Sequence, residues 1–415
     1  MKQAAPVVTH QTGERGSRVA GECDVIVVGG GPAGALLALL LARKGVRTLL
    51  LERHIDFHRE YRGEVLMPRF TRLFQQLGLE ALVEALPHRR LDGEEYYWMN
   101  RRIVSLGFCT VSPEIPYAVW TPQTALLDAL AELGSRHSSW SLWFDATVRD
   151  LIREGDRVVG VVVQKGDERI EVRSRVVVGA DGRFSSLRRL GGFEVAYNRH
   201  DFDILWFTIP ESGDQPTAFR TYLTPPRGYL ALPKDPNLVQ CGMLLPPHAW
   251  SSYKKRGIES LRAHLLEGPD FMHPFAREVK DFSSFTLLQA NLDFVKDWER
   301  GGLVLIGDAA HTCSPAGAVG VSIAVETAAV AAEVLLDCLD KGTFRKDALG
   351  EIQKRREPAV RAVHERQIRL GRAIGLPSFR RRRLASFVLP WLVRLGVVQS
   401  VLRPLVVGEP LALRS

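Results

Sequence analysis

The chain has 415 residues, of which 46% are hydrophobic and 25% are charged, and it carries a formal net charge of +8. The composition is that of a globular protein, and the length exceeds what one hydrophobic core usually supports, so we expect two joined lobes. No basic segment with interleaved aromatic residues accompanies the positive charge, which argues against nucleic-acid binding.

The polar segment from Met1 to Ala20 lacks the apolar core of a signal peptide, so residues 1–21 are predicted to form a disordered leader. No run of about eighteen apolar residues is free of charge, so we expect no membrane-spanning segment. The five cysteines include no C-x-x-C pair, which argues against a disulfide framework and against a metal site (Cys23, Cys109, Cys241, Cys313, Cys338). A cytoplasmic location fits this cysteine pattern best.

The first regular elements form a strand, helix and strand. Asp24 to Val28 reads as a buried strand, Pro32 to Lys44 as an apolar helix, and Arg47 to Leu51 as a second strand that ends at Glu52. This order is the opening of a dinucleotide-binding fold.

The next stretch combines helices with a block of hairpins. Helices are predicted from Met67 to Leu77 and from Thr124 to Leu133. Strands follow near 142–148, 158–163, 169–172 and 175–178, and they would return the chain to the nucleotide sheet.

The pattern changes near residue 201, where strands with alternating polarity follow one another (203–209, 218–223, 229–232 and 239–245). Leu303 to Ile306 resumes the buried-strand pattern, and helices are predicted at 320–339 and 345–370. The fold class is therefore α/β, with a Rossmann-like nucleotide lobe interrupted by a mostly antiparallel sheet. The predicted divisions are 22–200 and 296–340 for the nucleotide lobe, 201–295 for the inserted substrate lobe, and 341–415 for C-terminal helices.

A glycine motif lies between the first strand and the first helix. Gly29-x-Gly31-x-x-Gly34, with Pro32 and Ala33 inside it, would let a pyrophosphate approach the backbone at a helix N-terminus. Glu52 stands at the right distance to accept hydrogen bonds from a ribose. The motif predicts dinucleotide binding but does not separate FAD from NAD(P).

Two later motifs name the cofactor through a resemblance. The first is Gly179-Ala180-Asp181-Gly182-Arg183, and the second is Gly307-Asp308-Ala309-Ala310-His311, followed by Pro315, Gly317 and Gly320. In order and spacing, the three motifs resemble those of the single-component (class A) FAD-dependent monooxygenases of the p-hydroxybenzoate hydroxylase-like group. The resemblance runs from Asp24 to the final helices.

That resemblance implies FAD as the cofactor, with NAD(P)H as a transient electron donor that has no domain of its own. It also implies that O2 reacts at the flavin to give a C(4a)-hydroperoxide, which oxygenates a hydrophobic, aromatic or polycyclic small molecule in natural-product tailoring. The cofactor-binding residues implied are Gly29, Gly31, Pro32, Ala33, Gly34, Glu52, Arg53, Arg62, Gln123, Val148, Asp181, Asp308, Pro315, Gly317, Gly320 and Val321.

The chain departs from the group's pattern after Gly320, where the group usually carries asparagine two residues on and this chain has Val321-Ser322. Ser322 keeps a hydrogen-bonding group, so flavin binding is still expected. His311 is interpreted as structural rather than as a base.

The substrate is expected between the flavin and the inserted sheet, against a wall of Trp206, Tyr222, Tyr229 and Met243. No catalytic acid or base stands out, and Tyr222, Tyr229 and His248 are the candidates for activating a phenol-like substrate. For each wall residue, an ordinary place in the core is the competing interpretation.

The C-terminal stretch places Arg380 to Arg383 before Phe387, Leu389 and Trp391. Such a surface could touch a membrane peripherally, or pack on its own protein or on a second subunit. The oligomeric state, monomer or homodimer, stays open.

Three competing functions share the nucleotide motifs. A halogenase would be expected to show Trp-x-Trp-x-Ile-Pro, but Leu205 and Phe207 occupy the tryptophan places before Ile209-Pro210. A prenyl-chain reductase is nearer, because Pro226-Arg227-Gly228-Tyr229 begins like its signature, although the expected tryptophan does not follow. A flavin-free escort protein of the same fold would not need its phosphate glycines intact.

Overall fold

The structure is a computed structural model that describes residues 18–57, 64–211, 217–224, 227–234, 237–374 and 379–413. Its first lobe is built on a sheet in which β17, β18, β11, β1, β2 and β8 lie side by side, and β10 and β9 continue from β11. The strands of this sheet are β1 (Arg18–Val28), β2 (Thr48–Leu51), β8 (Trp140–Trp143), β9 (Ala146–Glu154), β10 (Arg157–Lys165), β11 (Glu168–Gly179), β17 (Glu299–Arg300) and β18 (Leu303–Leu305).

The four central strands β18, β11, β1 and β2 are all parallel. Parallel strands are buried on both faces, and the apolar run of β1 meets that demand, since Val25, Ile26 and Val27 are fully buried. Because β1, β2, β11 and β18 run in the same direction, the residues after Val28, Leu51, Gly179 and Leu305 meet at one edge of the sheet.

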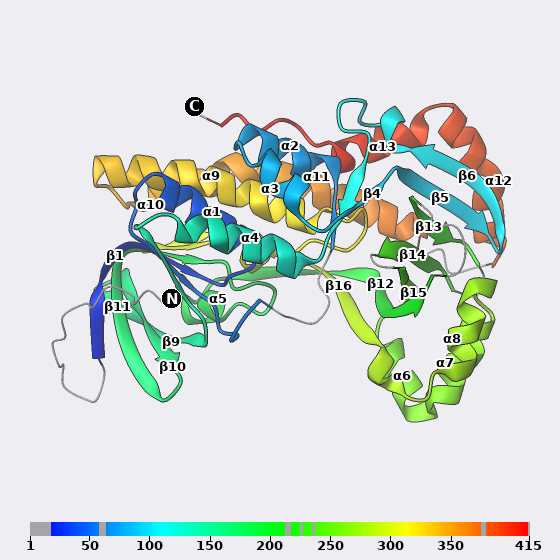
Figure 1. Cartoon of the computed structure of the whole chain (residues 1–415), viewed down its shortest axis with the longest axis horizontal. Coiled ribbons are helices and arrows are strands. Elements are labelled where there is room, and N and C mark those ends of the chain that lie inside the picture. Colours follow the sequence, from blue (N-terminus) through cyan, green and yellow to red (C-terminus); the bar gives the residue numbers. More distant parts are fainter. Residues whose placement is uncertain are drawn as a thin grey trace.

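Helices cover this sheet. Figure 1 shows α1, α4 and α9 lying together along one side of the lobe, while β9 and β10 extend on the other. α1 packs against both α4 and α9. The helices outside the substrate lobe are α1 (Pro32–Arg43), α2 (Pro68–Gln76), α3 (Glu80–Ala85), α4 (Gln123–Ser135), α5 (Ser186–Leu190), α9 (Gly320–Lys341), α10 (Lys346–Leu349), α11 (Glu351–Ile374), α12 (Phe379–Arg394) and α13 (Val397–Val406).

The second lobe is a seven-stranded sheet in the order β16, β12, β15, β14, β13, β5, β6. The pairings are antiparallel except for β13 with β5. Its strands are β5 (Gly93–Trp98), β6 (Arg101–Gly107), β12 (Val195–Pro210), β13 (Ala218–Tyr222), β14 (Tyr229–Lys234), β15 (Leu238–Leu245) and β16 (Thr286–Val295), and a small third sheet joins β3 (Val65–Leu66), β7 (Ala118–Trp120) and β4 (Arg89–Leu91).

The two faces of the second sheet have different neighbours. Leu205, Phe207 and Met243 share one hydrophobic cluster with residues of α6 (Ala249–Arg256), α7 (Ile258–Leu266) and α8 (His273–Glu278). Ile204 and Trp206 instead belong to the cluster that is continuous with the core of the nucleotide lobe. Side chains alternate along a strand, so one face carries the helices and the other faces the nucleotide lobe. Figure 1 shows α6 to α8 on the outer side of this sheet.

A buried ionic triad fixes the C-terminal helices to the nucleotide lobe. Glu326 of α9 accepts hydrogen bonds from Arg69 of α2, at 2.7 and 2.9 Å, and from Arg356 of α11, at 2.6 Å. Arg69 also donates to the carbonyl oxygen of Leu405 in α13 at 3.1 Å. Burial by itself would raise the pKa of Glu326, but the two arginines outweigh it and lower that pKa. The triad therefore joins four helices.

The predicted elements are present, with differences of extent. The first strand begins at Arg18 rather than Asp24, and the two strands predicted at 169–172 and 175–178 form the single strand β11. The segment predicted as one strand at 142–148 is broken between β8 and β9, where Asp145 has a positive φ of 53°. The predicted helix at 345–370 is divided at Gly350 into α10 and α11.

Two features of the second lobe were not predicted. The hairpin β5–β6 lies inside the segment 22–200, which was assigned to the nucleotide lobe, yet it extends the substrate sheet by pairing with β13. The helices α6 to α8 lie within 201–295, where only strands were expected. The substrate lobe is thus assembled from two separate parts of the chain.

Candidate functional site

The glycine motif forms a tight turn between β1 and α1. Gly29 has a φ of +106°, and a Cβ added to it would lie 2.4 Å from the carbonyl oxygen of Ala180. A Cβ on Gly34 would lie 2.0 Å from the carbonyl oxygen of Gly29, so helix and strand pack too closely for any other residue. Gly31 differs, because it has a φ of −76° and, chain neighbours aside, no atom of the described part of the chain lies within 4 Å of the position of its Cβ. The turn is therefore tightly packed at Gly29 and Gly34, and it has space beside Gly31.

The start of α1 suits an anion. Pro32 is its first residue, and its first turn contains no acidic side chain. The positive end of the helix dipole and the unpaired first N–H groups therefore face the open space at Gly31.

Glu52 follows β2 and is 2% exposed. Its carboxylate accepts the backbone N–H of Gly30 at 2.8 Å and that of His54 at 3.0 Å. These bonds hold the carboxylate beside the glycine turn. An acidic residue at the end of the second strand is the group that accepts a ribose hydroxyl in dinucleotide-binding folds.

The Asp-Gly and Gly-Asp motifs meet across 125 residues of sequence. Arg183 donates to the Asp308 carboxylate at 3.2 Å and to the carbonyl oxygen of Cys313 at 3.3 Å, while Arg188 donates to the carbonyl oxygen of Ala309 at 3.3 Å. The side chain of Asp308 remains 27% exposed. Asp308 is therefore held in place and keeps acceptor capacity for a ligand hydroxyl.

Asp181 has a local structural role. Its carboxylate accepts two hydroxyls and two backbone N–H groups from Ser185, Ser186 and Leu187, at 2.5 to 3.1 Å. It thereby caps α5. The backbone of the motif, rather than this carboxylate, lies next to the glycine turn, since Ala180 donates its N–H to the carbonyl oxygen of Val28.

The loop between Asp308 and α9 is fixed from α11 by a residue that sequence reasoning missed. Gln367 is fully buried, donates to the carbonyl oxygens of Ser314 and Ala316 at 2.8 Å, and accepts the N–H of Ser314 at 3.1 Å. Pro315 lies within this clamp, and Gly317 has a φ of +80°. A glutamine in the middle of a helix carries no motif, so its role could not be inferred from the sequence.

α9 begins at Gly320, at the end of this loop, with Val321 as its second residue. Its first turn holds no acidic side chain, and no side chain caps it. His311 is buried, its Nε2 lies 3.0 Å from the hydroxyl of Thr327, and its pKa is held well below the usual value by burial and by neighbouring His364 and Arg356. A buried neutral imidazole fits the structural interpretation of His311.

Other predicted cofactor residues lie outside the three motifs. Arg53 is exposed beside Glu52, Gln123 is the first residue of α4, and Val148 is buried in β9. β9 begins with Ala146, which donates its N–H to the carbonyl oxygen of Glu52. Arg62 lies outside the described residues.

The four predicted wall residues do not share a wall. Trp206 faces the nucleotide lobe, whereas Tyr222, Tyr229 and Met243 belong to the cluster on the opposite face, under α6 to α8. The hydroxyl of Tyr229 donates to the carbonyl oxygen of His264 in α7 at 2.6 Å. His248 immediately precedes α6, on that same far side. The prediction is therefore wrong for Tyr222, Tyr229 and Met243, because period-two alternation shows that faces differ but does not say which face is which.

The face toward the nucleotide lobe carries polar side chains that the sequence did not single out. Across the strands, Glu94, Phe219, Leu232 and Gln240 form one row, and Tyr96, Thr221, Leu230, Gly242 and Trp206 form the next. Tyr96 donates its hydroxyl to Glu94 at 2.6 Å. Burial raises the pKa of Glu94, partly offset by the Tyr96 hydroxyl, and burial raises that of Tyr96 well above its usual value. The Oε1 atom of buried Gln240 has no hydrogen-bond partner among the described residues.

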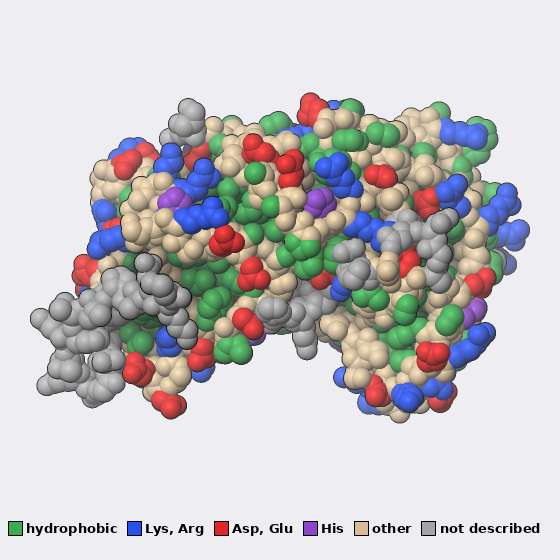
Figure 2. Space-filling view, in the orientation of Figure 1, with side chains coloured by type: hydrophobic (Ala, Val, Ile, Leu, Met, Phe, Trp, Pro, Cys, Tyr) green, Lys and Arg blue, Asp and Glu red, His purple; other side chains and the backbone are tan. Residues whose placement is uncertain are grey.

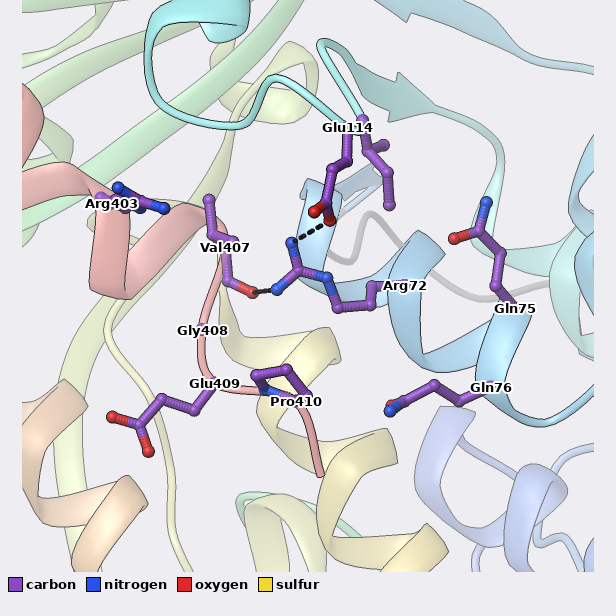
Figure 3. A pocket seen from close by; sticks show the side chains of 10 residues that line it. Arg72, Gln75, Gln76, Glu114, Arg403, Val407, Gly408, Glu409 and Pro410 are labelled. Atoms are coloured by element: carbon purple, nitrogen blue, oxygen red, sulfur yellow. Dashed lines mark hydrogen bonds and ion pairs between the residues drawn. The ribbon is translucent and has the colours of Figure 1, made fainter. Parts of the chain in front are cut away.

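A separate surface cavity of about 500 Å³ lies where α2 meets the C-terminal segment, and it is lined in part by Gln75 and Arg403 (Figure 3). Within it, Arg72 donates to the Glu114 carboxylate and to the carbonyl oxygen of Val407, both at 3.4 Å. None of the three motifs lines this cavity. Arg72 thereby links α2 to the segment that follows α13.

The edge of the first sheet where the three motifs meet, which we call the motif edge, fits FAD. It offers a turn with room for a pyrophosphate at Gly31, an acceptor for a ribose at Glu52, and a second partly exposed carboxylate at Asp308. It also offers two long helices, α1 and α9, with uncapped N-termini. Two anion-binding ends and two hydroxyl acceptors match a cofactor whose central pyrophosphate joins a ribose on one side to a ribityl chain on the other.

Comparison with known proteins agrees with this geometry. The FAD binding domain family model matches residues 22–367. The chain belongs to the FAD-dependent monooxygenases of this family. It is 31% identical to 6-methylpretetramide 4-monooxygenase of Streptomyces rimosus over 393 residues, covering 93% of this chain and 92% of that one.

Two further likenesses are more distant. The chain is 23% identical over 353 residues to a digeranylgeranylglycerophospholipid reductase of Methanothrix thermoacetophila, covering 80% and 82% of the two chains. In fold, it is similar to p-nitrophenol 4-monooxygenase of Pseudomonas putida, with a TM-score of 0.78, 18% identity, and coverage of 94% and 100%. The protein is thus an FAD-dependent oxidoreductase, and NAD(P)H is the electron donor typical of its family.

Proposed function

We propose that this monooxygenase hydroxylates a polycyclic aromatic substrate bound between the motif edge and the face of the second sheet that carries Trp206. The observation that carries the proposal is the asymmetry of that sheet. One face is sealed by α6 to α8, and the other presents Trp206, Tyr96, Glu94 and Gln240 toward the nucleotide lobe. The 31% identical relative is named for a reaction on 6-methylpretetramide, which supports a substrate of that class.

The dimensions of this face suit an extended ring system. Glu94 and Gln240 stand in the same row, three strand spacings apart, which is about 14 Å at the usual separation of neighbouring strands. Apolar Phe219 and Leu232 lie between them. A flat apolar body with polar groups at both ends would match this row.

The residues of the site divide the work with the cofactor. When bound, FAD supplies the redox chemistry by which NAD(P)H and O2 are used to transfer one oxygen atom. The glycine turn, Glu52 and Asp308 would hold it, and Gln367 would keep the Pro315 loop against it. The second sheet would orient the substrate and exclude water. Arg53, Gln123, Val148 and Val321 are proposed as further contacts to FAD.

Glu94 and Tyr96 are the groups best placed to handle a substrate proton. A carboxylate with a raised pKa is a stronger base than a solvated one, and it lies 2.6 Å from the oxygen of a tyrosine that can relay a hydrogen bond. We propose that Glu94 accepts the proton of a phenolic hydroxyl, which makes the ring carbons more electron-rich. Tyr96 positions that carboxylate.

The test is the rate of NADH and of NADPH oxidation by the FAD-loaded protein, with and without a panel of phenols, quinolones and polycyclic quinones. The proposal expects oxidation to accelerate with a polycyclic phenol and the product to gain the mass of one oxygen. Substrate-independent oxidation that yields only peroxide would contradict it.

A second candidate is reduction of a prenyl chain, favoured by the match to the archaeal reductase. It would consume reducing equivalents without O2. Anaerobic turnover of a polyprenyl substrate, with a gain of two hydrogens in the product, would favour this candidate over the hydroxylase. A halogenase would require halide, so halide dependence of product formation would identify that activity.

We further propose a cytoplasmic enzyme that works as a monomer or homodimer. The support is that all five cysteines are free thiols in the structure. Sedimentation or light scattering of the FAD-loaded protein decides between the two oligomeric states.

A further inference from the structure

The two last helices expose an unusual number of large apolar side chains. The exposed fractions reach 65% for Phe387, 63% for Trp391 and 73% for Leu395. We call the whole set the α12–α13 apolar face, and it comprises Leu384, Phe387, Val388, Trp391, Leu395, Val397 and Val401. Positions 384, 387, 388, 391 and 395 recur every three or four residues, so they lie on one side of the first of these helices.

This face is not needed for the fold. The opposite sides of the two helices already pack on the protein, because α12 contacts β5 and β6. Leu402, Leu405 and Val406 of α13 are buried, and Leu405 lies against Gly317 of the loop after Asp308. The exposed side chains are thus additional to a helix pair that is already anchored.

The chain segment that carries this face has charges of a single sign. Residues 379–408 contain six arginines and no aspartate or glutamate (Arg380, Arg381, Arg382, Arg383, Arg394, Arg403). Arg380, Arg383, Arg394 and Arg403 are exposed. Figure 2 shows Lys and Arg side chains gathered at the edge of the molecule where Figure 1 places α12. Apolar residues and positive charge therefore occupy the same surface.

The uniform charge decides between two occupants. A two-fold dimer would bring this surface against its own copy, which would set the four exposed arginines of each copy, eight in all, together with no acidic partner from this segment. A negatively charged lipid surface instead accepts both the arginines and the apolar side chains. We propose that the α12–α13 apolar face docks the enzyme onto an anionic membrane surface.

The geometry specifies docking rather than crossing. Among the described residues, no single helix is long and apolar enough to cross a membrane, and the pair 383–394 and 397–406 meets that test only together, across an 80° bend. Each helix can lie in the interface with Trp391 at the level of the headgroups and arginines reaching to phosphates. Leu405 of α13 lies against Gly317, so the membrane would then lie near the loop after Asp308. A lipophilic substrate would be concentrated in that membrane.

The experiment is co-sedimentation of the full-length, FAD-loaded protein with vesicles of phosphatidylcholine containing phosphatidylglycerol, and with vesicles of phosphatidylcholine alone. We expect binding to the anionic vesicles that weakens when salt rises from about 0.1 M to about 1 M, which shortens the Debye length from ~10 Å to ~3 Å. Removing one arginine near the surface should weaken binding about fivefold.

Three variants test the face itself. Trp391→Glu should abolish binding, while Tyr197→Glu, at a 74% exposed aromatic on β12, should not. Arg394→Ala should weaken binding, whereas Arg345→Ala, at an arginine 77% exposed beside α10, should not. Trp391→Phe should still bind vesicles. Brominated lipid should quench part of the tryptophan fluorescence of the wild-type protein, and this quenching should be lost in the variant. The exposed positions make these changes compatible with folding, which flavin absorbance near 450 nm and the melting temperature check in each variant.

Failure of the wild-type protein to bind anionic vesicles would overturn the proposal, as would binding that Trp391→Glu leaves unchanged. A wild-type dimer that Trp391→Glu converts to a monomer would assign the face to a second copy instead. None of these readouts uses substrate turnover, so the proposal stands or falls independently of the reaction proposed above.

Discussion

The motif edge of the nucleotide lobe and the inner face of the substrate sheet, which we propose as opposite sides of one site, are specified differently. At the motif edge, backbone geometry imposes residue type, because Gly29 and Gly34 have no room for a Cβ. At the sheet, Trp206, Tyr96 and Gln240 are placed on one face only through the register of five strands. The proposed cofactor site therefore follows from local sequence motifs, whereas the proposed substrate site follows from the way in which distant strands pair.

The largest effect is expected in the nucleotide lobe, at the Arg69–Glu326–Arg356 triad that anchors the C-terminal helices. Arg69→Met leaves Glu326 with one arginine in a buried site, and should lower the free energy of unfolding by about 3–5 kcal/mol. Arg361→Met is the matched control, since Arg361 is 57% exposed and its pair with Glu357 should contribute about 0–1 kcal/mol. Urea denaturation of the FAD-loaded proteins measures both. Equal losses would mean that the triad does not anchor the C-terminal helices.

The same triad predicts a pH dependence. Because the folded-state pKa of Glu326 is lowered, its contribution is complete above its unfolded pKa of about 4.3 and is lost as the pH falls through the folded value. The stability difference between the wild type and Glu326→Gln should thus shrink as the pH falls below about 4.3. A difference that stays constant to the acid limit would contradict this ionic role.

The next largest effect is expected at Gly31 of the glycine turn, on the affinity for FAD. Apart from its chain neighbours, Gly31→Ala meets no atom of the described residues within 4 Å, and its φ is ordinary, so it should fold normally. Its methyl group nevertheless enters the space assigned to the pyrophosphate. FAD affinity should fall at least about 100-fold, about 2.7 kcal/mol. Gly34→Ala should instead destabilise the fold. Flavin titration beside thermal melting separates the two, and full FAD affinity in Gly31→Ala would be inconsistent with the site.

The smallest effects compare the two faces of the substrate sheet. Tyr96→Phe should lower kcat/KM about tenfold and shift its pH profile, because Glu94 loses the hydroxyl that it accepts. Tyr229→Phe should cost about 1 kcal/mol of stability, since it removes the bond to His264, and leave kcat/KM unchanged. The reverse pattern would place the substrate on the other face. Steady-state kinetics over a range of pH, with melting temperatures, provide the comparison.

The same contrast explains what the sequence could predict. The glycine turn, Glu52, Asp308 and the strands that lead to them were foreseeable, because each follows from a local pattern of residues. Tyr222, Tyr229 and Met243 were assigned to the wrong face, since alternation does not reveal which face helices cover. Glu94 and Tyr96 were missed because β5 precedes the inserted segment by about a hundred residues and joins its sheet only through pairing with β13. Gln367 lies in a helix without a motif, and its clamp exists only once α11 has packed.

The most direct test of the central claim is turnover of a polycyclic phenol under 18O2 by the FAD-loaded protein, with product mass and NAD(P)H consumption measured together. The account predicts one 18O atom in each product molecule for each NAD(P)H oxidised, and loss of that incorporation in Gly31→Ala. Oxygen derived from water, or NAD(P)H consumed with no labelled product from any member of the panel, would contradict it.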